Sequence, residues 1–274
     1  MTGESSRIFV FLSHDVDWGR GGPPTHHILA RKERFSESVL KNLDKTNPYP
    51  NIPEILELED SLGIRSTFFF RTHVRDSKHP PPPYDLSEYK SDIRSMLSEG
   101  WEVGLHSDSI SSNSLENLEK EKNELEAVAG TKVFGNRVHY TLNNSILFRN
   151  LRKLGFKYDS SVKHQRETIS PKDFGYFLRE GLIVFPITIM DSLIFTYNVE
   201  TEADVLKIIR HAVDTCEKLR TKDKIVTLIW HDCSLKMRFG RKYPQVLAYL
   251  ASMKNLSVRR GIDLATMIEK GEIA

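Results

Sequence analysis

The sequence predicts an α/β fold, a distorted (β/α)7-type barrel whose strands run parallel. Apolar runs rich in β-branched and aromatic residues alternate with helical patterns along the 274 residues, which is the pattern of βαβ units. The runs are almost continuously apolar, as expected for strands buried on both faces of a parallel sheet. About seven such units favour a closed or nearly closed barrel over an open sheet.

The first strand lies in Ile8–Trp18, which reads I-F-V-F-L-S-H-D-V-D-W. It begins with apolar strand formers and ends in two carboxylates, Asp15 and Asp17. Side chains two apart in a strand point the same way, so both carboxylates should face one spot. Two like charges so placed repel unless a positive group lies beside them. This stretch therefore predicts a metal ion, another cation or a shared proton.

Glycine and proline divide the first half of the chain. We expect an insertion at about residues 19–52 that contains a helix at Thr25–Lys45. Pro53 then begins a helix that stops at Gly63. The further elements expected here are a strand at Arg65–Phe70, an extended proline loop at His79–Pro83, a helix at Ser87–Glu99, a strand at Trp101–His106 and a helix at Leu115–Ala129, capped by Ser114 and closed by Gly130.

The second half of the chain repeats the alternation. One strand, Leu182–Asp191, contains Pro186 and is expected to be irregular or at a sheet edge. The other expected elements are strands at Lys132–Tyr140, Phe156–Ser161 and Ile225–His231, helices at Asn144–Leu154, Glu202–Arg220 and Pro244–Lys254, and a short strand with a last helix in Ser257–Ala274.

The composition is that of an ordinary globular protein. Hydrophobic residues make up 39% and charged residues 28%, and the net charge is +2, so no general attraction to nucleic acid or membrane is indicated. The two cysteines, Cys216 and Cys233, do not form a disulfide framework. No signal peptide or membrane span is recognised. We expect one cytoplasmic domain over residues 1–274, with no nucleic-acid partner; the sequence does not indicate an oligomeric state.

Polar side chains collect where the predicted strands end. In barrels of this kind the C-terminal ends of the strands form the active face. One such residue could be a turn or cap residue, but several strand ends with reactive groups favour a functional site. The residues are Asp15, Asp17, His106, Arg137, His139, Asp159, Asp191 and His231.

Five short motifs in this order resemble those of the polysaccharide deacetylases of carbohydrate esterase family 4, which have the NodB-like fold. The resemblance covers roughly residues 8–233. A narrower similarity, to the WbmS-like branch linked with bacterial surface polysaccharides, rests on the variant forms of the second and third motifs. The motifs are S-H-D-V-D at 13–17, G-L-H-S at 104–107, R-V-H-Y at 137–140, D-S-S at 159–161 and L-I-W-H at 228–231.

The resemblance implies roles for the matching residues. Asp15 is the expected general base and Arg137 the residue that holds it ionised, since a guanidinium lowers the pKa of a neighbouring carboxylate. His231 is the expected acid that protonates the leaving amine. Asp17 and His106 are the expected metal ligands, and the backbone N–H of Tyr140 is expected to help bind the oxyanion.

The sequence departs from the family pattern at Ile110, where the family has its second metal histidine. Isoleucine cannot ligate a metal, so another ligand, weak binding or no metal are the alternatives. His139 is the preferred replacement, because it is two residues from Arg137 and points the same way. Asp108 is the second choice. His14 is the third, because it should point away from the aspartates.

Three further residues are candidates for contact with substrate. Trp18 and Trp230 flank the expected site, and aromatic faces often stack on sugar rings, although core packing is an equal alternative. Asp191 is expected either to contact substrate or to orient His231.

The sequence thus predicts a metal-dependent hydrolase of a non-peptide C–N bond, most simply the N-deacetylation of an amino sugar or polysaccharide. Zinc suits an Asp/His site, with nickel, cobalt or iron as alternatives. The expected partner is a carbohydrate or another N-acylated small molecule. Two alternatives remain open: a metal-independent hydrolase of cyclic amides or ureides on the same fold, and an inactive relative that only binds carbohydrate.

Overall fold

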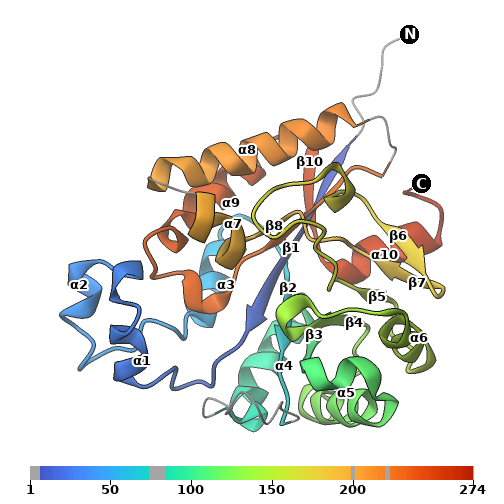
Figure 1. Cartoon of the computed structure of the whole chain (residues 1–274), viewed down its shortest axis with the longest axis horizontal. Helices are drawn as coiled ribbons and strands as arrows, with labels where there is room; N and C mark the ends of the chain where they lie inside the picture. Colours follow the sequence, from blue (N-terminus) through green and yellow to red (C-terminus); the bar gives the residue numbers. More distant parts are fainter. Residues whose placement is uncertain (1–6, 74–83, 199–200, 220–222, 274) are drawn as a thin grey trace.

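The sheet that organises the molecule is curled and almost entirely parallel (Figure 1). A computed structural model describes residues 7–73, 84–198, 201–219 and 223–273. The proline loop expected at His79–Pro83 lies outside these residues. Within them the strand order is β6-β7-β5-β4-β3-β2-β1-β9-β8, and β10 is a further partner of β1. This matches the predicted distorted barrel of parallel strands.

Strand β1, Ile8–Val16, is an interior strand of the sheet and is buried throughout. It pairs along its length with β9, Ile225–Ile229. On its other side, β10, Leu256–Arg259, pairs with the first half of β1, and β2, Thr67–Phe70, pairs with the second half. Because β1 pairs with strands on both sides, the residues that follow it lie between the C-terminal ends of β2 and β9.

The strand expected at Leu182–Asp191 is two strands. Its first part, β7 (Leu182–Val184), pairs with β5 (Tyr158–Asp159), and its second part, β8 (Ile189–Met190), pairs with β9 at the other edge of the sheet. Residues 185–188 connect these two strands, and Pro186 lies in this connection. The prediction of an irregular strand is therefore confirmed, and the prediction of one continuous strand is wrong.

The remaining strands complete the parallel arrangement, except for one hairpin. Strand β6, Phe177–Arg179, which the sequence did not predict, runs antiparallel to β7. Strands β3, Glu102–Ser107, and β4, Gly135–Val138, lie between β2 and β5.

Helices cover the outside of the sheet (Figure 1). Helix α5 has the predicted bounds, because the Ser114 side chain caps its start and Gly130, at φ 76°, closes its end. Helix α7 was not predicted. The helices around the sheet are α3 Ile52–Asp60, α4 Lys90–Ser98, α5 Leu115–Ala129, α6 Ser145–Lys153, α7 Asp191–Asn198, α8 Glu202–Lys218 and α9 Tyr243–Ser252, while α10, Gly261–Glu269, packs on the inner face of the sheet. None of the described helices is long and apolar enough to cross a membrane.

The two faces of β1 enter different cores. Its even-numbered residues Ile8, Val10 and Leu12 join the large cluster between sheet and helices. Phe9 and Phe11 join a smaller cluster inside the curled sheet, where aromatic rings pack edge to face. Because side chains alternate along a strand, the odd-numbered face of β1 also directs the aspartates that end it towards the inside.

The insertion at residues 19–52 forms short elements instead of the predicted helix at Thr25–Lys45. These are α1 (Thr25–Leu29), a 3-10 turn at Lys32–Arg34 and α2 (Glu37–Leu40). In Figure 1, α1 and α2 lie to one side of the sheet. They have a small apolar cluster of their own, which includes Ile28, Phe35, Tyr49 and Cys233. The insertion thereby packs on the segment that follows β9.

Candidate functional site

Asp15 and Arg137 form a buried ion pair at the base of the site. Arg137 Nη1 donates to Asp15 Oδ1 at 2.6 Å. The guanidinium also donates to Ser13 Oγ, Ser160 Oγ and the Ser160 carbonyl oxygen, so its orientation is fixed. Burial acts to raise the pKa of Asp15, but Arg137, with help from two histidines, outweighs it and holds the pKa below its ordinary value. Asp15 is therefore ionised at neutral pH.

Asp17, His106 and His139 meet above this pair. Asp17 Oδ1 lies 3.2 Å from His106 Nε2 and 3.4 Å from His139 Nδ1. The two ring nitrogens are 3.2 Å from each other. His106 Nδ1 lies 2.9 Å from the Arg137 carbonyl oxygen, which fixes the ring and leaves Nε2 facing the carboxylate. The preferred replacement for the missing histidine, His139, thus lies beside the two other expected ligands.

These three donors fit a divalent cation. Three donors bound to zinc at about 2.0–2.1 Å in tetrahedral geometry are roughly 3.3 Å apart, close to the distances seen here. Asp17 Oδ1 is buried and has no hydrogen bond of ordinary geometry among the described residues, although buried carboxylate oxygens are normally satisfied. Of the described residues, Asp17, His106 and His139 are the group placed to share an ion.

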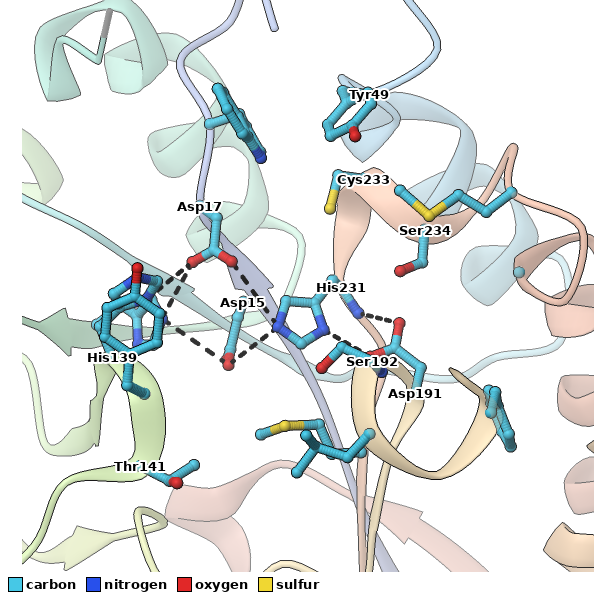
Figure 2. Close-up of a pocket in the computed structure, with 18 of the residues that line it drawn as sticks. Asp15, Asp17, Tyr49, His139, Thr141, Asp191, Ser192, His231, Cys233 and Ser234 are labelled. Atoms are coloured by element: carbon cyan, nitrogen blue, oxygen red, sulfur yellow. Dashed lines mark hydrogen bonds and ion pairs between the residues drawn. The ribbon is translucent and has the colours of Figure 1, made fainter. Parts of the chain in front are cut away.

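His231 faces the aspartates from the opposite side to His139 (Figure 2). Its Nδ1 lies 2.5 Å from Asp191 Oδ1, and its backbone N–H donates to Asp191 Oδ2. Its Nε2 lies 3.9 Å from Asp15 Oδ2 and 3.8 Å from Asp17 Oδ2. Burial alone would lower the pKa of His231, but the carboxylates, Asp191 foremost, raise it to about 10. Of the two roles expected for Asp191, the geometry matches that of orienting His231.

A cleft of about 1270 Å³ opens over these residues. Trp18 lines it, as expected, and packs edge-on against His27 and Tyr49 of the insertion. Tyr140 also lines it and packs at a tilt against the His139 ring, with centroids 3.9 Å apart. Tyr140 and Thr141 both have left-handed backbone conformations, at φ 62° and 56°, an uncommon arrangement for residues other than glycine and typical of strained functional turns.

Trp230 does not line the cleft, so the expectation that it contacts substrate is corrected. Its side chain is fully buried and packs against Phe195 and Tyr243 in the outer core. The reason is strand alternation: His231 points to the inside of the curled sheet, and its neighbour must point outwards.

The other two alternative ligands are engaged elsewhere. Asp108 is buried, accepts from Arg71 Nη2 at 3.0 Å and caps the turn that contains Ile110. His14 is fully buried on the outer face, where its Nε2 lies 2.8 Å from Glu59 Oε1. His14 therefore points away from the aspartates, as predicted.

Sequence reasoning missed several residues that line or support the cleft. Arg71 follows directly after β2, so its position at a strand end was an available signal. Ser13 and Ser160 lie in two of the recognised motifs, but their hydrogen bonds to Arg137 join residues distant in the chain and could not be read from local pattern. The residues contributed by the insertion, Arg31 and Arg34, depend on its non-local packing and could not be placed from local pattern.

Comparison with known proteins gives a fold relationship. No family model matches the sequence, and no curated protein matches it either. Solved structures do match. A protein assigned as a polysaccharide deacetylase from Mycobacterium smegmatis has a TM-score of 0.67 at 18% identity, over 100% of this chain and 94% of its own. Puue allantoinase has a TM-score of 0.65 at 14% identity, over 97% and 92%.

A mutant of BA3943, a CE4 family pseudoenzyme, is also similar, with a TM-score of 0.54 at 13% identity, over 96% of this chain and 69% of its own. The chain thus has the fold of the polysaccharide deacetylases, the NodB-like barrel that its motifs predicted.

Proposed function

We propose that this protein is a metal-dependent hydrolase of a non-peptide C–N bond, acting on an N-acetylated amino sugar or its glycan. The observation that carries the proposal is the close approach of one His106 and one His139 nitrogen to Asp17 Oδ1, a buried oxygen without a hydrogen bond of ordinary geometry among the described residues. This group lies between an ionised carboxylate, Asp15, and a protonated imidazole, His231. The likeness to a polysaccharide deacetylase of the same fold supports the choice of substrate class.

Asp17, His106 and His139 hold the ion in this proposal. Two imidazoles and one carboxylate suit zinc, with nickel, cobalt or iron as alternatives. When bound, a divalent ion polarises the acyl oxygen and makes water a stronger acid.

The residues of the chain supply the proton transfers. Asp15, kept ionised by Arg137, accepts a proton from the attacking water as the water oxygen bonds to the acyl carbon. His231, kept protonated by Asp191, gives a proton to the nitrogen as the C–N bond breaks. The products are a free amine and a carboxylate. Tyr140 lies at the edge of the cleft, where its backbone N–H is the proposed donor to the oxyanion.

The test is acetate release from N-acetylated sugars by purified protein supplied with zinc, nickel or cobalt. Asp15→Asn and His231→Gln should each lower the rate by at least about 100-fold, the range of general acid–base contributions. Arg259, an exposed residue of β10 outside the cleft, provides the matched control Arg259→Gln. Unchanged acetate release in Asp15→Asn would falsify the assignment.

A second candidate, a metal-independent hydrolase of cyclic amides or ureides, is favoured by Ile110 in place of the family's second histidine and by the likeness to an allantoinase. Metal analysis of the untreated protein separates the two. One equivalent of ion that is lost in Asp17→Ala excludes the metal-free reaction, while hydrolysis of a ureide by metal-stripped protein supports it.

A further inference from the structure

The cleft has a basic wall that the proposed chemistry does not use. Arg31 and Arg34 of the insertion line it, together with Arg238 from the segment after β9. The three form one group, which we call the arginine group. The backbone N–H of Arg238 donates to the Arg34 carbonyl oxygen at 2.7 Å, and the N–H of Arg34 donates to the Arg31 carbonyl oxygen at 3.0 Å. Their positions on the wall are therefore fixed relative to one another.

The arginine group is poorly neutralised by the protein. Within the part of the chain that the structure describes, Arg31 and Arg238 have no ion pair. Arg34 Nε lies 3.9 Å from Glu33 Oε1, and the Glu33 side chain is 70% exposed, so this pair contributes little. Arg31 Nη1 donates to the His27 carbonyl oxygen at 3.3 Å. Since each guanidinium carries five N–H donors, most of the donors in the group are left for a ligand.

The surroundings of the group are positive as well. Burial lowers the pKa of His27, and Arg31, His26 and Arg34 lower it further. Arg166, from the segment after β5, also lines the cleft. Carboxylates line other parts of the same cleft, so the positive charge is local to the arginine group, where it concentrates anions. Three neighbouring cations are also unfavourable in the empty cleft, and an anion removes that cost.

We propose that the arginine group binds an anionic substituent of the substrate, a carboxylate or a phosphate, and so makes this protein selective for acidic amino sugars. Guanidinium forks match both oxyanions in geometry and charge. Trp18 and Tyr49 line the cleft beside the group, and their rings provide apolar surface for the sugar. The proposal rests on the proposed function for the identity of the sugar, but the binding of the anion is measured separately.

The experiment measures binding by calorimetry in the Asp15→Asn background, which removes the proposed base so that ligands persist. The probes are N-acetylglucosamine, N-acetylglucosamine 1-phosphate and N-acetylglucosaminuronic acid, which differ in charge but share the acylated sugar. The variants are Arg31→Gln, Arg34→Gln and Arg238→Gln, with Arg259→Gln as the exposed control. A thermal melt of each variant checks that it is folded.

At least one anionic probe should bind roughly tenfold or more tightly than the neutral sugar, the range of a charge-assisted hydrogen bond. The arginine variants should each lose most of that advantage, while Arg259→Gln keeps it. The advantage should also shrink as salt is raised from about 0.05 to 0.5 M. Whichever anionic probe binds more tightly than the neutral sugar shows whether the group prefers a carboxylate or a phosphate.

Equal affinity for the neutral and anionic probes, or an advantage that survives in all three arginine variants, overturns the proposal. So does the absence of measurable binding by both anionic probes in folded protein. Acetate release from a neutral sugar without anion preference leaves the proposed function standing and rejects only the anion site. Anion preference without acetate release from any probe leaves the anion site standing and rejects the proposed function.

Discussion

Asp15 and Arg137 lie 122 positions apart in the sequence and form a 2.6 Å hydrogen bond in the interior, where neither side chain is more than 3% exposed. The same guanidinium donates to Ser13 and Ser160, so it joins β1, β4 and β5. One arginine therefore both sets the charge of the proposed base and ties together three parts of the sheet.

Arg137→Met should destabilise the fold by about 3–5 kcal/mol, because it leaves the Asp15 carboxylate buried without a partner. The pKa of Asp15 is depressed in the native protein, so the contribution of the pair is present above the unfolded pKa, near 3.8, and is lost as the pH falls through the lower folded value. In the variant, the buried Asp15 carboxylate loses its unpaired charge by taking up a proton at acidic pH. Urea denaturation should thus show a smaller difference from wild type at pH 4 than at pH 7; a gap that widens on acidification contradicts the role given to Arg137.

Asp191→Asn should lower the pKa of His231 from about 10 towards its ordinary value near 6.5, because Asp191 is the largest cause that raises it. His231 stays protonated in the native protein until the pH rises through about 10, and in the variant it loses its proton near neutrality. Titration of the His231 ring by NMR measures this directly. The alkaline limb of the pH–rate profile should move down by the same amount, and a limb that stays in place would show that another group supplies the proton.

His139→Ala should weaken zinc binding by more than about 100-fold, beyond the loss seen when only a supporting hydrogen bond is removed. Asp108→Asn is the matched control, since Asp108 pairs with Arg71 and is not among the three clustered donors. Competition with a chelating dye gives both affinities. If Asp108→Asn costs more affinity than His139→Ala, the ligand assignment is wrong.

Trp230→Phe should leave sugar affinity and turnover within about twofold of wild type, because the ring packs on Phe195 and Tyr243 away from the cleft. Trp230→Ala should instead lower the free energy of unfolding by about 3–5 kcal/mol through the cavity that it opens. Trp18→Ala provides the contrast, since Trp18 lines the cleft. A loss of sugar binding in folded Trp230→Phe would restore a substrate role for this residue.

Local signals were enough to predict the elements that carry the chemistry. The β1 run and the capped helix α5 depend on residues near in sequence, and so does the placement of Arg137, in β4, and His139, directly after it, towards the same site. For Trp230, substrate contact and core packing were equal alternatives, although alternation with His231 already favoured the core.

The failures elsewhere have non-local causes. Nothing near Pro186 indicates that the residues before it pair with β5 and those after it with β9, towards opposite ends of the strand order. The insertion likewise breaks at Arg31 and Ser36 because its apolar residues pack on Cys233, about 200 positions away. Such contacts override the helical pattern of the segment itself.

Residues 185–188 carry the chain from β7 to β8, so one short segment of backbone links the two ends of the curled sheet. Among the described residues no ladder of named strands joins β7 to β8, so this buried connection is the covalent link between the two ends of the curled sheet. Asp191 comes after β8, which directly follows this segment, and its Oδ1 lies 2.5 Å from His231 Nδ1. The orientation of the proposed proton donor therefore depends on the path of this connection, because Asp191, which contacts His231, follows it in the chain.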